Sequence, residues 1–268
     1  MTLQEPEIID PRAGKIYFAS DFHLGIPNHD SSLEREKLLV RWLEDIRSDA
    51  TAIYLMGDVF DFWFEYRTVV QKGYIRLLGK LAEISDSGIP IHLFKGNHDI
   101  WAFNYLSNEL NIHLHRDKLI AVLGNKCFFL AHGDGRGPGD KSYKLMKKVF
   151  ESRFNQWLFR WIHPDIGSQI ARFFSNKSRY ANEFKQEKFG APPIEEEQLY
   201  KYCLLKAREH PEVDIFLFGH RHRPMDVSIN DKARMVILGD WLYHFTYAVF
   251  DGEVLELKKF EPVENSGY

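Results

Sequence analysis

Five short clusters of metal-ligand residue types punctuate this chain. They are Asp21-Phe22-His23, Gly57-Asp58-Val59-Phe60-Asp61, Gly96-Asn97-His98-Asp99, His132-Gly133-Asp134 and Gly219-His220-Arg221-His222. Carboxylates, imidazoles and one amide oxygen suit divalent ions such as Mn²⁺, Fe²⁺ or Zn²⁺. No cysteine belongs to the set, which argues against a structural zinc site. The set is too large for one ion and predicts two ions that share a carboxylate, an arrangement that clamps the attacking and leaving oxygens of a phosphoryl displacement.

Each cluster follows a run that predicts a buried strand, because these runs are short, apolar and rich in aromatic and branched residues. The five runs are Ile16–Ala19, Ala52–Met56, Ile91–Phe94, Cys127–Ala131 and Ile215–Phe218. In an open α/β sheet, ligand groups gather just beyond the carboxyl ends of the strands. The five clusters are scattered over about two hundred residues, yet they can converge on one site.

Helical spacing of apolar residues predicts two helices between the first three strands, over residues 32–47 and about 69–85. Ser31 or Ser32 is the expected N-cap of the first helix, and Ser87-Gly88 is the expected end of the second. This alternation of strand and helix predicts parallel strands with right-handed crossovers.

Later in the chain, short strand-like runs replace the alternating pattern. Two pairs of these runs flank Gly124-Asn125 and Asp251-Gly252, and both dipeptides predict hairpin turns. We therefore expect an α/β fold in which two mixed sheets pack face to face with helices outside. The whole chain, residues 1–268, is expected to form a single domain.

Composition narrows the class of protein. Hydrophobic residues make up 44% and charged residues 27% of the chain, as in soluble globular proteins. The net charge of −3 argues against a generally basic nucleic-acid-binding protein. Cys127 and Cys203 look like isolated thiols, which favours a reducing compartment. We expect no signal peptide, because the first fourteen residues lack an apolar core, and no run reaches the roughly 20 apolar residues of a membrane span.

Residues 141–190 differ from the rest of the chain. They hold eleven Lys and Arg against four Asp and Glu, a local charge of +7, and they also hold eleven aromatic residues. Helical patterns run over about 142–161 and over 169 or 176 to 188, broken at His163-Pro164. The segment is either a helical insertion packed on the sandwich or a lid over an anionic substrate with a large apolar part. Basic amphipathic helices also suit a membrane surface.

The D-x-H, G-D-x-x-D, G-N-H-D, H-G-D and G-H-x-H motifs, in this order, resemble those of the calcineurin-like binuclear metallophosphoesterases. This resemblance implies one ion held by Asp21, His23, Asp58 and His222. It implies a second ion held by Asp58, Asn97, His132 and His220, so that Asp58 bridges the two. Mn²⁺ is the expected metal, with Fe²⁺ or Zn²⁺ as alternatives, and a metal-activated hydroxide is the expected nucleophile.

A narrower resemblance covers about residues 15–260. Ser178, Asn182 and Lys185 have the S-x-x-x-N-x-x-K spacing found in the lid of the UDP-2,3-diacylglucosamine diphosphatases of the lipid A pathway, and Asp140 falls where that family has a substrate-binding aspartate. The resemblance implies attack at the α-phosphorus of the UDP-linked lipid, giving UMP and 2,3-diacylglucosamine 1-phosphate. It also implies a cytoplasmic enzyme, peripheral to the inner membrane of a Gram-negative bacterium. This chain departs from the best-known branch, which has arginine in place of His98.

The remaining expectations concern catalysis and alternative functions. His98, if protonated, would stabilise charge on the phosphoryl oxygens, and Asp99 would either orient His98 or cap its loop. Asn97, His98 and His220 are also expected to contact the substrate.

Two alternative functions stay open. One is a phosphodiesterase or phosphatase for a small soluble ester, and the other is a catalytically inactive binding scaffold, which the filled ligand positions disfavour. No base-recognition motif is present, so nucleic acid is not an expected partner.

Overall fold

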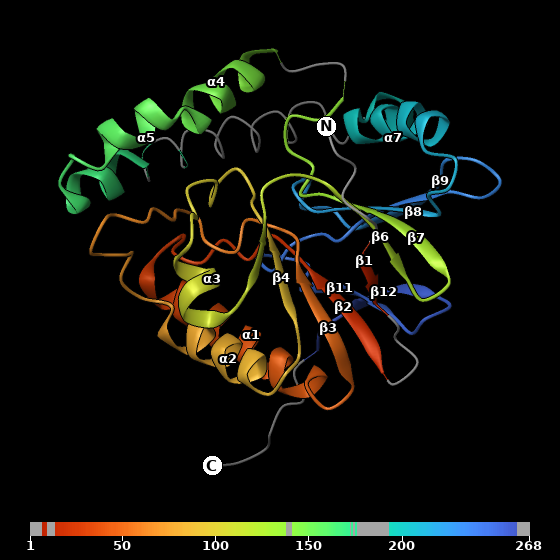
Figure 1. The fold of residues 1–268 in the computed structure, drawn as a ribbon, viewed down its shortest axis with the longest axis horizontal. Helices are drawn as coiled ribbons and strands as arrows, with labels where there is room; N and C mark the ends of the chain where they lie inside the picture. Colours follow the sequence, from red (N-terminus) through yellow and green to blue (C-terminus); the bar gives the residue numbers. More distant parts are fainter. Residues whose placement is uncertain are drawn as a thin grey trace.

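Two six-stranded sheets form the centre of the molecule (Figure 1). The structure is a computed structural model that describes residues 7–9, 14–137, 141–171, 173, 175 and 193–261. The first sheet has the order β12 (Leu255–Lys259), β11 (Thr246–Phe250), β2 (Lys15–Ala19), β3 (Ala50–Leu55), β4 (Ile91–Phe94) and β5 (His113–His115). The second has the order β1 (Glu7–Ile9), β6 (Leu119–Leu123), β7 (Lys126–Leu130), β8 (Ile215–Phe218), β10 (Arg234–Ile237) and β9 (Met225–Ser228).

Both sheets are mixed, as the sequence predicts. Strands β2 to β5 run parallel, and β11 joins them antiparallel to β2. In the second sheet β7, β8 and β10 are parallel, whereas β6 and β9 pair antiparallel to their neighbours β7 and β10. The predicted hairpin turns are confirmed: β6 and β7 pair directly across Gly124-Asn125, and β11 and β12 pair across the loop that contains Asp251-Gly252.

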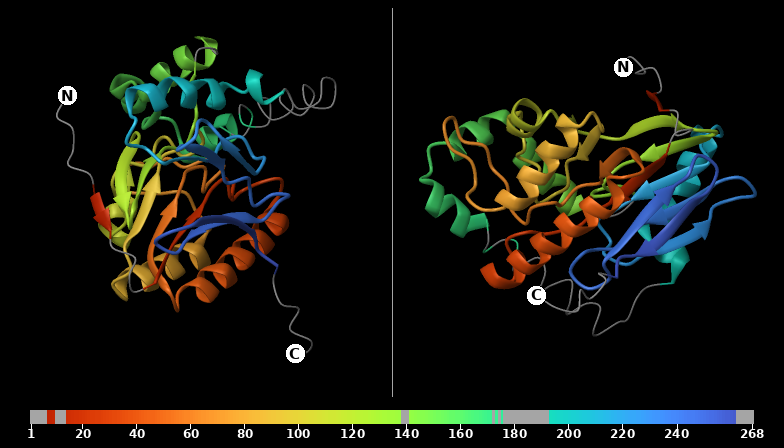
Figure 2. Two further views of the ribbon diagram at one scale, coloured as in Figure 1. Left: turned by 90° about the vertical axis from the view of Figure 1, so that its right-hand side faces the viewer. Right: turned by 90° about the horizontal axis from the view of Figure 1, so that it is seen from below.

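Apolar side chains fill three layers, one between the sheets and one on each outer face. The inner layer includes the stacked rings of Phe18, Tyr54 and Phe128, with Phe18 at 5.1 Å and 5.7 Å from the other two centroids. Helices α1 (His29–Ile46), α2 (Ile75–Asp86) and α3 (Tyr105–Leu110) cover the outer face of the first sheet. Helix α7 (Gln198–Glu209) covers the second sheet on the opposite side of the molecule (Figures 1 and 2).

Two helix boundaries differ from the prediction for local reasons. Helix α1 begins three residues early because Asn28, not Ser31 or Ser32, is its N-cap and accepts the N–H of Ser31 at 2.9 Å. Helix α2 begins only at Ile75, after Tyr74 adopts a left-handed backbone with φ of 58°. The buried side chain of Glu36 accepts N–H groups of the first turn of α2, a long-range contact that sequence spacing does not reveal. Strand β1 and helix α3 were not predicted.

The predicted long helix over residues 142–161 is wrong in one respect, because it is broken at Ser152. Helix α4 (Lys141–Glu151) and helix α5 (Arg153–Phe159) meet there, since Ser152 has an extended ψ of 120°. Helical structure resumes at residues 164–171, just after the predicted break at His163-Pro164. Among the described helices, none combines the length and the apolarity that a membrane crossing needs.

Helices α4 and α5 lie along one side of the molecule, in green at the top of Figure 1. They are tied to the core by Trp101, whose indole N–H donates to the carbonyl of Phe150 at 2.8 Å. The ring of Phe159 packs on Trp101 and Phe64, with centroid distances of 4.6 Å and 4.7 Å. Many other apolar side chains of these helices face solvent, including Trp157, which is 52% exposed.

Candidate metal centre

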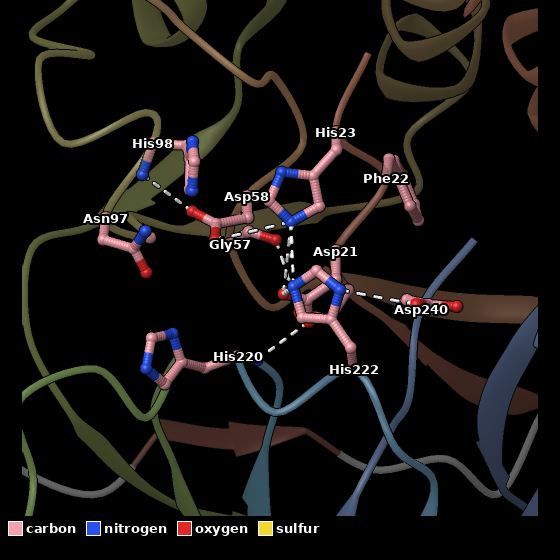
Figure 3. Close-up of polar contacts among 12 residues, drawn as sticks. Asp21, Phe22, His23, Gly57, Asp58, Asn97, His98, His220, His222 and Asp240 are labelled. Carbon is pink, nitrogen blue, oxygen red and sulfur yellow. Dashed lines mark hydrogen bonds and ion pairs between the residues drawn. The ribbon is translucent and has the colours of Figure 1, made fainter. Parts of the chain in front are cut away.

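The loops that follow β2, β3, β4, β7 and β8 bring all five sequence clusters together at one edge of the two sheets. Each candidate ligand cluster begins within three residues of the end of its strand. Figure 3 shows side chains from the loops after β2, β3, β4 and β8 facing one another. The predicted convergence therefore arises because parallel strands deliver their carboxyl ends to the same edge.

Asp21, His23 and His222 form the first group that could hold a metal ion. The Oδ1 atom of Asp21 lies 3.4 Å from Nε2 of His222 and 3.7 Å from Nε2 of His23. The two Nε2 atoms are 3.1 Å apart and face each other (Figure 3). Asp21 and His23 are almost fully buried, so their donor atoms are aimed into the site rather than toward solvent.

Asp58, His132 and His220 form a second such group. Nε2 of His132 lies 3.2 Å from Oδ2 of Asp58 and 3.4 Å from Oδ1 of Asn97. The same oxygen of Asp58 lies 3.7 Å from Nε2 of His23, which belongs to the first group. Asp58 therefore stands between the two groups, in the position that a shared carboxylate would require.

A third group with donor atoms close together consists of His23, Asp61 and His98. Oδ1 of Asp61 lies 3.3 Å from Nδ1 of His23, and the rings of His23 and His98 are 4.7 Å apart in an edge-to-face arrangement. His23 belongs to both the first and the third group, and its Nδ1 and Nε2 face different neighbours. Asp61 of the third group therefore contacts the ring nitrogen of His23 that faces away from Asp21.

The backbone of these loops is unusual. Asp21, His23, Asp58, His220 and His222 all have left-handed φ angles between 45° and 69°. Such conformations cost on the order of 1–3 kcal/mol each for residues other than glycine and gather at functional sites. Five of the seven expected ligands are therefore held in conformations that local propensity does not favour.

Glycines allow the loops to approach one another closely. A Cβ atom on Gly96 would lie 2.1 Å from Oδ1 of Asp58, and one on Gly219 would lie 2.6 Å from Oδ2 of Asp21. Both contacts are too short for any side chain, so these two positions require glycine. The glycines of the G-N-H-D and G-H-x-H motifs thus serve the packing of the site.

Three of the histidines are oriented by an acceptor at Nδ1, which leaves Nε2 for the centre. Nδ1 of His132 lies 2.8 Å from the carbonyl oxygen of Met56, and Nδ1 of His222 lies 3.4 Å from Oδ2 of Asp240. Together with the contact between His23 and Asp61, this is the arrangement that metal-ligating histidines usually have. The buried side chain of Arg35 donates to the carbonyls of Phe22, His23 and Ile26 and so holds the first loop in place.

Sequence reasoning missed Asp240 and Arg35. Asp240 follows β10 as part of Gly239-Asp240, the same strand-then-Gly-Asp pattern that singled out Asp58. That pattern was a usable signal for Asp240. Arg35 lies on α1, eight residues or more along the chain from its three partners, and nothing in the local spacing distinguishes it from a solvent-facing arginine.

Charges in the site favour cations. Burial opposes protonation of His23 and His132, yet the surrounding carboxylates outweigh burial and raise the pKa of both to about 10. Burial likewise opposes charge on Asp58, but His132, His98 and His23 hold its pKa well below the usual range. Burial and the neighbouring His132 lower the pKa of His220 to about 4.

Divalent metal ions fit this set of donors. Oδ1 of Asp21 is buried and, among the described residues, has no hydrogen-bond partner of normal geometry. The facing Nε2 atoms of His23 and His222 lie 3.7 Å and 3.4 Å from this oxygen and 3.1 Å from each other. Carboxylate oxygens and imidazole nitrogens that converge in this way are suited to share a cation, and the carboxylates already favour positive charge there.

The hydrogen bonds of Asp99 match the loop-capping alternative rather than the orienting one. Nδ1 of His98 lies 2.9 Å from the carbonyl oxygen of Asp61, whereas the carboxylate of Asp99 accepts the N–H groups of Gly96 at 2.7 Å and Val59 at 2.9 Å. Asp99 therefore caps loops rather than orienting His98. Burial lowers the pKa of His98, and Asp99 is not among the groups that raise it.

Asp134 links the site to helix α4. Its Oδ2 atom accepts the hydroxyl of Tyr143 at 2.8 Å and the ammonium of Lys147 at 2.6 Å. Ser175, in the next helical stretch, donates to Oδ2 of Asp61 at 2.8 Å. Two buried carboxylates of the clusters thus anchor the helical segment. Of the predicted substrate contacts, Asp140, Ser178, Asn182 and Lys185 lie outside the described residues.

Comparison with known proteins agrees with this geometry. Residues 14–224 match the family model described as calcineurin-like phosphoesterase. The chain belongs to this family. This phosphoesterase is 44% identical to the UDP-2,3-diacylglucosamine hydrolase of Porphyromonas gingivalis over 260 residues, 93% of this chain and 99% of the relative. A protein of the same name from Histophilus somni is 24% identical over 230 residues, 85% of this chain and 92% of its own.

The similarity of this chain to solved structures is weaker than its similarity to the sequence relatives. A dimetal phosphatase from Danio rerio is 14% identical and matches 92% of this chain and 95% of its own, with a TM-score of 0.46. That similarity is too distant to bear on function. The resemblance to metallophosphoesterases that the sequence motifs predict is confirmed by the family match and by the sequence relatives.

Proposed function

We propose that this phosphoesterase hydrolyses the diphosphate of UDP-2,3-diacylglucosamine and releases UMP and 2,3-diacylglucosamine 1-phosphate. The convergence of carboxylate and imidazole donors at one sheet edge supports the reaction class, which is metal-dependent hydrolysis of a phosphate ester. The choice of substrate is supported by the Porphyromonas gingivalis relative, which this chain matches over nearly its full length. The reaction would belong to lipid A synthesis.

For the metals, we propose one ion held by Asp21, His23, Asp58 and His222. The second would be held by Asp58, Asn97, His132 and His220. The short distances between their donor atoms support this division, with Asp58 shared. When bound, two such ions, which we take to be Mn²⁺, would activate a water molecule and clamp the attacking and leaving oxygens.

His98 would stabilise charge on the phosphoryl group. Its Nδ1 is occupied by the carbonyl of Asp61, so Nε2 is the atom left to face a substrate. Donation from Nε2 requires the imidazolium form, which burial disfavours and which an adjacent phosphoryl anion would favour. The buried carboxylate of Asp99 would act only by fixing the loop that carries His98.

Residues 141–190 would form the lid, as the sequence suggests. The described helices of this segment expose large apolar side chains, for example Leu145 at 66% and Phe154 at 64%. Exposed apolar patches of this kind mark interaction sites, and here they support contact with acyl chains or a membrane. Each Lys or Arg near an anionic bilayer would add about 1 kcal/mol. We therefore place the enzyme at the cytoplasmic face of the inner membrane of a Gram-negative bacterium.

The proposal is tested by incubating the purified protein with UDP-2,3-diacylglucosamine and Mn²⁺ and measuring UMP by ³¹P NMR. A small chromogenic phosphodiester serves as the second substrate. Lys185→Ala should raise KM for the lipid and leave hydrolysis of the chromogenic ester nearly unchanged. If no UMP appears while the small ester is hydrolysed, the enzyme acts on a soluble ester instead. Equal loss on both substrates would remove Lys185 from lipid binding.

A further inference from the structure

A cavity of about 220 Å³ lies between the Gly96 loop and helices α4 and α5. It is separate from the candidate metal centre, since none of the candidate metal ligands lines it. Three of the four cations that line it come from three different parts of the fold: Lys95 after β4, Arg116 after β5 and Arg153 at the start of α5. Apolar walls are supplied by Ile100 and Phe103.

Carboxylates do not neutralise these three cations. Among the described residues, none of the three has an Asp or Glu oxygen within ion-pair distance, and Lys95 donates only to the carbonyl of Ile100 at 3.2 Å. The acid that lines the cavity, Glu151, has its carboxylate 4.0 Å from the ammonium of Lys147, a fourth cation at the wall. Lys147 is itself paired with Asp134 at 2.6 Å.

The cationic excess suits a phosphate group. Two guanidinium groups on separate elements can each offer a fork of N–H donors to phosphate oxygens, and an ammonium adds a point charge. Phe103 helps to hold Lys95 at the wall, since the Lys95 ammonium lies 5.3 Å from its ring centroid. Next to Arg153, exposed aromatic rings on α5 face solvent, notably those of Phe154 and Trp157.

We propose that this cavity is a second anion site, which binds a phosphate group carried by a phospholipid headgroup or present as free phosphate. Because no candidate metal ligand lines this cavity, the site is distinct from the position of the reacting diphosphate. Occupation would place a phosphate between the core and helices α4 and α5. Binding at this site does not depend on which ester the enzyme hydrolyses.

The test uses the full chain freed of metal with EDTA, so that phosphate cannot bind at the metal centre. Wild type is titrated calorimetrically with inorganic phosphate at constant ionic strength. The double variant Arg116→Gln/Arg153→Gln should bind phosphate at least about tenfold more weakly, because two charge-assisted contacts are lost. Arg116→Lys/Arg153→Lys should recover part of the affinity. The matched control Arg41→Gln/Arg208→Gln removes two exposed arginines from α1 and α7 and should bind as wild type does.

A second arm distinguishes the two sources of phosphate. The same proteins are sedimented with phosphatidylcholine vesicles that contain or lack phosphatidylglycerol. Selective loss of binding to the anionic vesicles in Arg116→Gln/Arg153→Gln, compared with the control pair, assigns the site to a headgroup. Loss of inorganic phosphate binding alone assigns it to free phosphate. The proposal is overturned if wild type binds neither probe saturably, or if the double variant binds both as the control pair does. Unchanged circular dichroism and thermal unfolding would show that the variants are folded.

Discussion

Two buried histidines of the candidate metal centre, His23 and His132, and the buried His92 of β4 have opposite electrostatics. At the centre, His23 and His132 face the carboxylates of Asp21, Asp58 and Asp61. These carboxylates outweigh burial and raise the pKa of both histidines to about 10. The centre therefore holds positive charge in a buried place.

Along β4 and β5, His92 lies in a stack of rings and is only 1% exposed. Its ring lies 4.3 Å from that of Tyr54 and 4.9 Å from that of His113, and its Nδ1 lies 2.9 Å from Nε2 of His115. Burial and then the neighbouring histidines lower the pKa of His92 to about 3, and burial and His113 lower that of His115 to about 4.

The contrast shows that the neighbouring side chains, rather than burial alone, determine the pKa and the charge of a buried histidine. Both groups are desolvated, and desolvation alone disfavours the charged form. Carboxylates reverse that effect at the centre, where a cation can replace the protons. The stack offers aromatic faces and other imidazoles, so His92 and His115 stay neutral and act as packing groups. The following experiments alter one side of this contrast at a time.

The largest effect should come from removing the carboxylate shared by the two groups at the centre. Asp58→Ala should lower kcat for UDP-lipid hydrolysis by about a thousandfold or more, because several kcal/mol of metal-based stabilisation are lost. Metal content, measured by plasma emission spectroscopy, should fall at both positions. Asp45→Ala, on the exposed face of α1, is the control. Retention of two ions and full rate in Asp58→Ala would refute the bridging role.

Replacing His98 should have the next largest effect on rate. His98→Ala should lower kcat by about two to three orders of magnitude, the usual loss for one transition-state donor. His98→Arg should recover part of the rate, since arginine presents a permanently charged fork to phosphate. Steady-state kinetics at saturating metal measure both. Recovery by His98→Gln equal to that by His98→Arg would show that charge is not what His98 contributes.

Weakening the support behind one ligand should have a smaller effect. Asp240→Asn removes the carboxylate that lies 3.4 Å from Nδ1 of His222. Affinity for one Mn²⁺ should drop about 10- to 100-fold, as is typical when the acceptor behind a ligating histidine is lost. Competition with a fluorescent chelator measures this, with the exposed Asp231→Asn as control. Equal affinities in the two variants would argue against a role for Asp240 at the metal.

The smallest expected effect concerns acid stability and the histidine stack. The pKa of His92 is about 3 in the folded chain and about 6.5 unfolded, so only the unfolded chain takes up this proton between those values. The contribution of His92 to the free energy of unfolding should therefore fall as pH drops below about 6.5, by roughly 2 kcal/mol at pH 5.

His92→Phe should flatten that dependence, because phenylalanine keeps the stacking and cannot be protonated. Urea unfolding at pH 7 and pH 5 measures the difference for wild type, His92→Phe and the control His29→Phe, whose histidine is exposed. The measurement is the change between the two pH values, so any overall loss of stability in His92→Phe does not affect it. The same pH dependence in all three proteins would place the acid sensitivity elsewhere.

The sequence by itself determined the five strands that carry the clusters and the order of the clusters. The boundaries of β4 and β8 were predicted residue for residue, because a short apolar run between polar residues is a local signal. The turn at Gly124-Asn125 was equally local. Convergence of the clusters also followed, since parallel strands of a sheet place their ends at one edge.

Only the tertiary structure decided which groups support the site. Arg35 beneath the first loop, Asp240 behind His222 and Asp99 as a loop cap all depend on contacts between distant parts of the chain. The break between α4 and α5 and the neutral stack around His92 were likewise invisible in the local pattern. Periodicity reports which face of an element is buried. It does not report which side chain from another element will lie against that face, and that neighbour sets both hydrogen bonding and charge.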